Sequence, residues 1–373
     1  MRQVLRSFAS LALVFGISQA LAQAPQPLVR FTFDSSDEGW AGIGVNCRAS
    51  VTTQSSFNGA GALKFDYDLR PKNMGFVGFQ ADPAKLQGVQ TFRFWVKADQ
   101  TTALGFIIQE KGGGRFTLLF AVPKGTWQKV EVSPDELVLN EGSDDPKDDN
   151  GRLDTDRIEA VAIGDLAQFI AQAGSSEFAA LLGLELGPRS LLIDDFMATT
   201  EKLAPAIVAT PKEVRLDTFA RPQVSWLATC PVSVVKGETG TPPGLAATYK
   251  QAFGRIVALG RMVPKGTLRG MSRLSFTVSS RQRVMLVVQL EESGGGKFNT
   301  LVEVPEGSQA KPVTIDFGSL NPADDSAVKD RGVKAELVNQ VLFLEATMLT
   351  GTVSDQENVL QIRDLKAGAA TGN

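Results

Sequence analysis

Short stretches in which apolar and polar residues alternate, separated by turn residues, follow one another along most of the chain. Residues 62–69 (ALKFDYDL) alternate in this way, and residues 92–97 place Arg93, Trp95 and Lys97 on one face with apolar residues on the other. Because the side chains of a strand point alternately to its two faces, this pattern is typical of half-buried β-strands. The sequence therefore predicts many short strands and very little helix.

A long internal repeat organises these strands. Residues 86–137 return as residues 268–320, and the glycines at 112–114 return at 294–296, an offset of 182. Each glycine-rich stretch lies between two alternating segments, which predicts a β-hairpin, because glycine adopts positive φ at low steric cost. The repeat predicts two copies of one β-rich domain.

The repeat also suggests the domain boundaries. We expect a first β-jelly-roll domain at residues 28–200, a proline-containing linker at 201–211 and a second β-jelly-roll domain at 212–368. Residues 168–182 contain helix-forming residues that the second copy lacks, so one short helix is expected there. The predicted fold class is all-β, with two tandem antiparallel β-sandwiches, since a parallel α/β fold needs a helix after each strand.

The first residues resemble a targeting segment. Arg2 and Arg6 precede a short apolar run at residues 8–17, and Ala20-Leu21-Ala22 fits a signal peptidase site. We therefore expect residues 1–22 to be a signal peptide and the protein to be periplasmic or secreted. The alternative, an uncleaved membrane anchor, is disfavoured because the run is too short to span a bilayer.

Composition excludes several classes of function. The chain has a net charge of −3 and no basic stripe, so no nucleic-acid partner is expected, and no later stretch is apolar enough for a membrane span. It contains no histidine and two cysteines, which rules out a Ser-His-Asp device and the usual zinc sites. Glu110 and Glu131 could suggest a glycosidase pair, but nothing in the sequence sets their separation. We expect no enzyme activity.

Four motifs, in order, resemble a known superfamily. They are FTFDSSDEGW (31–40), ALKFDYDL (62–69), GTWQKVEVSPDEL (125–137) and SLLIDDFMATTE (190–201). The first copy resembles the galactose-binding-like β-jelly-roll superfamily, in particular family-11 carbohydrate-binding modules and complex I intermediate-associated protein domains, and the second copy resembles it more weakly. The resemblance implies a jelly roll with a concave face that holds oligosaccharide, and in some relatives a structural calcium near the first and last strands.

Candidate ligand-binding residues in the first copy are Arg93, Trp95, Lys97 and Tyr67, with Trp127 as a further aromatic candidate, because aromatic rings stack on the C–H faces of sugars. The alternative is a strand whose second face is covered by a loop or by the other domain. In the second copy, serine and threonine replace the three outward residues of the 92–97 strand. Trp40 and Trp226 follow the first strand of each copy and are expected to lie in the cores.

Asp34, Asp194 and Asp195 are the candidate calcium ligands, since calcium prefers oxygen donors. The alternative is ordinary aspartates at turns and strand ends, because no EF-hand spacing is present, and no cofactor is expected to be required. In the second copy Arg363 replaces the first aspartate of the pair.

The two cysteines, Cys47 and Cys230, occupy equivalent positions in the two copies. If the copies pack about a pseudo-twofold axis, the pair could form a disulfide between the domains, which export would favour. The alternative is two buried free thiols.

The leading functional hypothesis is a non-catalytic exported protein that binds an oligosaccharide or polysaccharide, mainly through the first domain. The alternative is a structural or protein-interaction module of the cell envelope, without a sugar site and with a protein partner.

Overall fold

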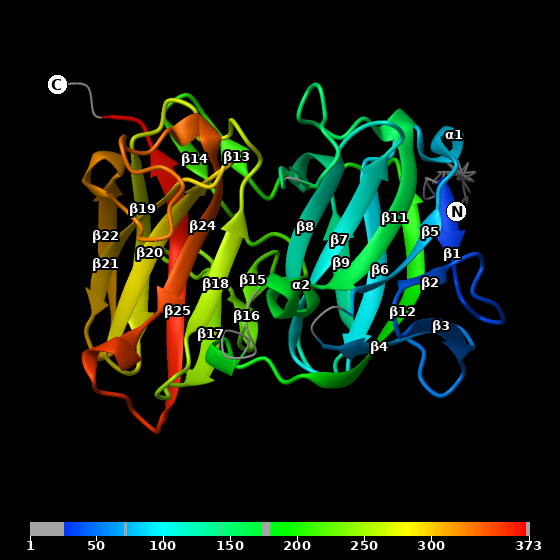
Figure 1. Cartoon of the computed structure of the whole chain (residues 1–373), viewed down its shortest axis with the longest axis horizontal. Helices are drawn as coiled ribbons and strands as arrows, with labels where there is room; N and C mark the ends of the chain where they lie inside the picture. Colours follow the sequence, from blue (N-terminus) through cyan, green and yellow to red (C-terminus); the bar gives the residue numbers. More distant parts are fainter. Residues whose placement is uncertain (1–25, 71–72, 143, 174–179, 371–373) are drawn as a thin grey trace, which may run out of the picture.

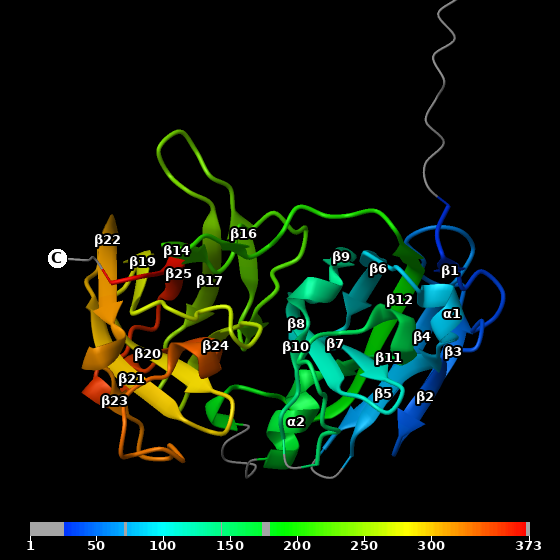
Figure 2. The ribbon, with the colours of Figure 1, turned by 90° about the horizontal axis from the view of Figure 1, so that it is seen from above.

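The strands of the computed structural model form two β-sandwiches that lie side by side (Figures 1 and 2). The structure describes residues 26–70, 73–142, 144–173 and 180–370, so the expected signal peptide lies outside the described residues. Each sandwich contains two sheets of antiparallel strands, which we call sheets A and B in the first sandwich and sheets C and D in the second. The predicted all-β fold of two tandem sandwiches is confirmed.

Sheet A has the order β3-β4-β12-β6-β9, with β1 also paired to β12, and sheet B has the order β10-β8-β7-β11-β5-β2. The strands of sheet A are β1 (Val29–Phe31), β3 (Cys47–Thr52), β4 (Ala62–Leu69), β6 (Thr91–Ala98), β9 (Gln128–Val132) and β12 (Gly187–Thr199). Those of sheet B are β2 (Ala41–Gly44), β5 (Gly75–Gln80), β7 (Thr102–Glu110), β8 (Arg115–Val122), β10 (Val138–Leu139) and β11 (Ile158–Asp165).

The second sandwich repeats this order strand for strand, because sheet C runs β16-β17-β25-β19-β22 and sheet D runs β23-β21-β20-β24-β18-β15. The strands of sheet C are β13 (Val208–Ala209), β14 (Glu213–Arg215), β16 (Val232–Val235), β17 (Gly244–Lys250), β19 (Arg273–Ser280), β22 (Gly307–Asp316) and β25 (Glu357–Gly368). Those of sheet D are β15 (Leu227–Ala228), β18 (Val257–Met262), β20 (Val284–Glu292), β21 (Lys297–Val304), β23 (Asn321–Pro322) and β24 (Val338–Glu345).

Helices are short and lie between strands. Among the helices that the structure describes are α1 (Pro83–Leu86) and α2 (Leu166–Ala173), and the 3₁₀ turns include η1 (Pro134–Glu136), η2 (Thr155–Arg157), η3 (Phe317–Ser319), η4 (Ala335–Leu337) and η5 (Thr347–Thr350). Helix α2 begins two residues before the stretch in which a helix was predicted, residues 168–182, and overlaps its first part; residues 174–179 of that stretch lie outside the described residues. The described part of the chain contains no helix that is long and apolar enough to cross a membrane.

Each core lies between the two sheets of its sandwich and is rich in phenylalanine. Trp40 is buried against Phe33 and Phe196 in the first core, and Trp226 is buried in the second, where its Nε1 donates to Asp217 at 2.8 Å. Both tryptophans were predicted to be core residues, and this is confirmed. Burying such large rings is a major source of stability, because each removes ~150–250 Å² of surface from water.

The two sandwiches contact each other through surfaces that are not equivalent. The segment before β15 lies against the β8–β9 edge of the first sandwich: Gln223 hydrogen-bonds both backbone groups of Glu131, and the amide of Ala121 donates to the carbonyl of Val224 at 2.9 Å. The equivalent edge of the second sandwich, β21 and β22, lies at its far side (Figure 1). The arrangement is therefore head-to-tail and not pseudo-twofold.

A buried ion pair also connects the two sandwiches. The guanidinium of Arg221 hydrogen-bonds the carboxylate of Glu136 on η1, and it also donates to the carbonyl of Ala204 at 2.7 Å. Both charged side chains are buried. Since removal of either partner would leave a buried charge without compensation, this pair links the two sandwiches strongly.

Candidate functional site

The outer face of sheet A carries the residues that the alternation of β6 predicted. Phe92, Phe94 and Val96 are fully buried in the core, and Arg93, Trp95 and Lys97 point outward and are half-buried. The Nε of Arg93 donates to Glu131 on β9 at 2.8 Å, and its Nη2 donates to Glu201 at 3.2 Å. The two faces of this strand are therefore divided as predicted.

Three aromatic rings meet on this face, and we call them the aromatic cluster: Phe57, Trp95 and Trp127. The ring of Phe57 stacks on the indole of Trp95 with centroids 3.5 Å apart and an interplanar angle of 14°. Trp127 meets Phe57 edge-on, with centroids 6.2 Å apart. The ring of Phe57 is 43% exposed, so it is Phe57, and not Trp95 alone, that presents an aromatic surface to solvent.

Buried and exposed carboxylates hold the loop that carries Phe57. Asp194, which is fully buried, accepts hydrogen bonds from the amides of Phe57 at 2.7 Å and Asn58 at 2.9 Å. Asp34 accepts from the amide of Ala60 at 2.5 Å. Gly59 has φ +66°, and a Cβ there would lie 2.1 Å from Asp34 Oδ1, so the loop needs glycine at this position. These backbone hydrogen bonds and the glycine therefore hold Phe57 over Trp95.

These contacts give the three predicted calcium ligands other roles. Asp34 and Asp194 accept backbone amides, and Asp195 pairs with Arg30 at 2.9 Å. Backbone hydrogen bonding from Ala60 lowers the pKa of Asp34, whereas burial raises the pKa of Asp194. Within the described ranges, no group of three or more histidine, cysteine, aspartate or glutamate side chains is placed to hold a metal ion, and the calcium site stays a prediction.

The placement of Tyr67 corrects a prediction. Its side chain lies in the core, stacked on Phe65, and its hydroxyl donates to Asp165 Oδ2 at 2.6 Å. Burial raises the pKa of Tyr67, so the hydroxyl stays protonated and keeps this donor role. Tyr67 points to the opposite side of sheet A from Trp95, because it belongs to the core-facing set of β4. It is therefore not part of a shared ligand face.

The predicted disulfide is also wrong, since Cys47 and Cys230 are both free. Cys47 begins β3 at the far side of the first sandwich, whereas Cys230 precedes β16, on the side of the second sandwich that faces the first (Figure 1). The head-to-tail contact separates positions that a twofold axis would have brought together. Burial raises the pKa of the Cys230 thiol to about 12.

The second sandwich has no counterpart of the aromatic cluster. The outward positions of β19 are Ser275, Thr277 and Ser279, and the loop between β16 and β17, residues 236–243, contains no aromatic residue. The two carboxylates considered for glycoside hydrolysis lie on different sheets, with Glu110 on β7 and Glu131 on β9. Glu131 is engaged by Arg93 and Lys129, so it does not form a catalytic pair with Glu110.

Phe57 is the residue that sequence reasoning missed. It is a single large apolar residue in the polar loop SSFNGAG (55–61). Because this loop has no alternating pattern that would place the ring in a core, an isolated phenylalanine in it is expected to be exposed. That isolated position is the feature of the sequence that could have identified Phe57. Its contact with Trp95 depends on Asp194, which is 137 positions away in the chain.

No protein family and no curated protein matches this sequence. Among solved structures, the family 11 carbohydrate-binding module of the cellulosomal cellulase Lic26A-Cel5E of Clostridium thermocellum is similar, with 14% identity and a TM-score of 0.35, over 44% of this chain and 99% of the module. The CBM22-1–CBM22-2 tandem domain of Paenibacillus barcinonensis Xyn10C is similar over 94% of this chain and 99% of its own, with 13% identity and a TM-score of 0.32. The family-11 modules named from the sequence resemblance are thus among the similar structures.

Proposed function

We propose that this protein is a non-catalytic carbohydrate-binding protein and that the aromatic cluster of the first sandwich is its sugar-binding surface. The observation that carries the proposal is the ring of Phe57, which is 43% exposed and fixed over Trp95 by hydrogen bonds to its own loop. A ring that is held rigidly in solvent contributes contact area at a low entropic cost, which favours stacking on a sugar.

Polar groups beside the rings also support the proposal that this surface binds sugar. Arg93, Lys97 and Lys129 are half-buried next to Trp95 on the outer face of sheet A and can donate hydrogen bonds to hydroxyl groups. Lys97 forms no ion pair with any described residue, so its ammonium is available. We propose binding mainly through the first sandwich, export to the periplasm or the medium, and no enzyme activity.

The test is affinity electrophoresis and calorimetry of the full chain with soluble β-glucans, xylan and other neutral polysaccharides. Phe57→Ala and Trp95→Ala are expected to weaken binding about tenfold, which corresponds to ~1.4 kcal/mol. The matched control is Phe253→Ala, because Phe253 is 66% exposed on the second sandwich, outside the aromatic cluster. It is expected to leave binding unchanged.

Two results would overturn the proposal. One is the absence of retardation by every polysaccharide, which together with a protein partner would favour an interaction module of the envelope. The other is full binding by the Phe57→Ala/Trp95→Ala double variant, provided that its melting temperature shows it to be folded. Release of reducing sugar from a polysaccharide would instead show an enzyme.

A further inference from the structure

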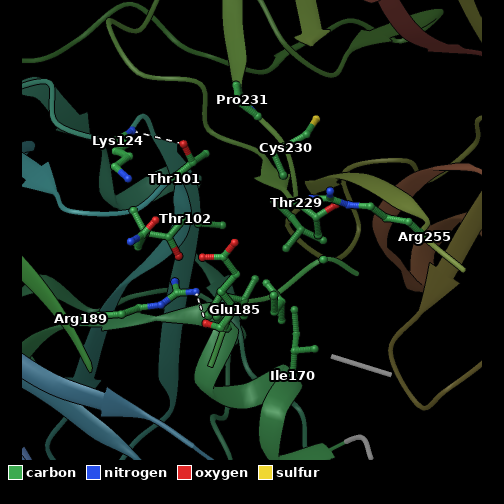
Figure 3. Close-up of a pocket in the computed structure, with 18 residues that line it drawn as sticks. Thr101, Thr102, Lys124, Ile170, Glu185, Arg189, Thr229, Cys230, Pro231 and Arg255 are labelled. Atoms are coloured by element: carbon green, nitrogen blue, oxygen red, sulfur yellow. Dashed lines mark hydrogen bonds between the residues drawn. The ribbon is translucent and has the colours of Figure 1, made fainter. Parts of the chain in front are cut away.

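A small polar cavity lies between the two sandwiches (Figure 3). Its volume is about 180 Å³, which is similar to the ~150 Å³ of an engineered cavity that binds benzene, so it can hold one small organic molecule. None of the three rings of the aromatic cluster lines it. Its polar side chains come from both sandwiches and include Thr101, Lys124, Glu185 and Arg189 from the first and Thr229 and Arg255 from the second.

Arg255 is held in place across the boundary between the sandwiches. The amide of Ile256, the next residue, donates to the carbonyl of Leu181 at 2.7 Å. The guanidinium lies directly against Gly183, where a Cβ would be 2.4 Å from Arg255 Nε. Gly183 also has φ +68°, which disfavours any other residue. The backbone of the first sandwich therefore lies directly against a cation that belongs to the second.

Positive charge exceeds negative charge around the cavity. Arg189 is buried and paired with Asp165 at 3.1 Å, which neutralises it. Neither Lys124 nor Arg255 forms an ion pair with any residue within the described parts of the chain. Against these two cations, the described residues that line the cavity contribute one carboxylate, that of Glu185.

The hydroxyl groups of the cavity are arranged as donors. Thr229 Oγ1 accepts the amide of Ala258 at 2.9 Å, and Thr101 Oγ1 accepts the amide of Lys124 at 3.3 Å. A hydroxyl that accepts a backbone amide keeps its own proton to donate. Both threonines can therefore donate to an anion, while Glu185 can accept from a hydroxyl group.

We propose that this cavity binds a small hydroxylated carboxylic acid of the uronic-acid class and that this molecule bridges the two sandwiches. The carboxylate is placed at Arg255, because the guanidinium fork suits carboxylate geometry. The hydroxyl groups of the ligand are placed at Glu185, at the threonines and at Lys124, which lies across the cavity from Arg255 (Figure 3). This site is separate from the aromatic cluster, and the proposal does not rest on the proposed function.

The experiment is calorimetric titration of the full chain with D-glucuronate and D-galacturonate, with glucose and galactose as neutral counterparts and inorganic phosphate as a plain anion. A uronate is expected to bind at least about tenfold more tightly than its neutral counterpart or phosphate. Arg255→Gln and Lys124→Gln are each expected to weaken uronate binding about tenfold, because hydrogen bonds in which the donor is charged are the strong ones. The control is Arg281→Gln, an exposed arginine of the second sandwich that pairs with Glu357 at 3.8 Å, and no change is expected.

Several results would overturn this inference. They are no heat with either uronate at millimolar concentration, phosphate binding as tight as uronate binding, or unchanged uronate binding by the Arg255→Gln/Lys124→Gln double variant. Phe57→Ala is expected to bind uronate normally. Loss of uronate binding in that variant would place the acid on the aromatic cluster and would also refute a separate site.

Discussion

The first sandwich is expected to become less stable as the pH rises from 5 to 8, and the cause is Glu110. This glutamate, at the end of β7, is fully buried. Its Oε1 accepts the amide of Asp154 at 2.5 Å, but its Oε2 has no hydrogen-bond partner and lies 4.0 Å from Arg157 Nη1. Burial raises the pKa of Glu110 from 4.5 to about 7, and the nearby charges of Asp148 and Asp154 act in the same direction.

The sign and size of the effect follow from this pKa. A carboxyl whose pKa is higher in the folded than in the unfolded protein binds its proton more tightly when folded, so folding is favoured at low pH. The stabilisation is complete below about pH 4.5 and is lost as the pH rises through about 7. Each pH unit between these two values lowers the free energy of unfolding by about 1.4 kcal/mol, so the total decrease is on the order of 3 kcal/mol.

The repeat provides a matched control at the equivalent residue of the second sandwich. Glu292, also buried, is held by two hydrogen bonds from Arg331, at 2.6 and 3.0 Å, and by the amide of Lys334 at 2.5 Å. Glu110→Gln is expected to raise stability at pH 8 and to leave it nearly unchanged at pH 5. Glu292→Gln is expected to lower stability at both, because it removes the partner of Arg331.

The assay is urea unfolding between pH 5 and pH 8, followed by tryptophan fluorescence. Three of the four tryptophans, Trp40, Trp95 and Trp127, lie in the first sandwich, so this signal reports mainly on that sandwich. A flat stability of the unmodified protein across this range would refute the reasoning. So would a Glu110→Gln variant whose pH dependence runs parallel to that of the unmodified protein.

Three further predictions concern the interface, the thiols and calcium. Arg221→Gln leaves the buried Glu136 without its partner and is expected to cost about 3–5 kcal/mol in urea unfolding at pH 7. Lys265→Gln, which breaks the exposed pair with Glu141, should cost only about 0–1 kcal/mol, and equal losses would contradict the account. Thiol titration of the unfolded, non-reduced protein is expected to find two reactive thiols, and none would restore the Cys47–Cys230 bridge. Excess chelator is expected to leave the melting temperature unchanged, because amides and Arg30 already engage the three aspartates, and a fall would show a bound ion.

Local pattern in the sequence predicted the strands and their faces well. The alternation of residues 92–97 is decided by whether each side chain meets the core, which is a local property of a strand. The repeat extended this prediction to a second sandwich with the same strand order, because equivalent hydrophobic patterns bury equivalent faces. The same local pattern applies to Tyr67, because it alternates with Leu63 and Phe65 and therefore lies on the core side of β4.

The aromatic cluster could not be predicted in the same way. The placement of Phe57 depends on the carboxylate of Asp194, which sits at an irregularity in the pairing of β12 with β6. A bulge of this kind redirects a side chain that strict alternation would have placed elsewhere. The loop has no periodic pattern of its own, so only the three-dimensional contact identifies its ring as part of the site.

The arrangement of the two sandwiches could not be predicted from the repeat, for a related reason. Equivalence in sequence places two residues at the same point of two folds, but it says nothing about which surfaces of those folds meet. What decides the contact is a difference between the copies: Asp217 and Trp226 are nine positions apart, whereas Asp34 and Trp40 are six apart, and the longer segment contains Arg221 and Gln223.

The two copies also differ at the edge that, in the first sandwich, is contacted by Arg221 and Gln223. Glu136, which receives Arg221, lies at the end of η1, and the corresponding end of η3 is Ser319, which can provide no ion pair. In β22 the edge strand also contains Pro312, which has no amide to offer to an added strand. The edge of the second sandwich that corresponds to the covered edge of the first is therefore chemically unsuited to the same contact.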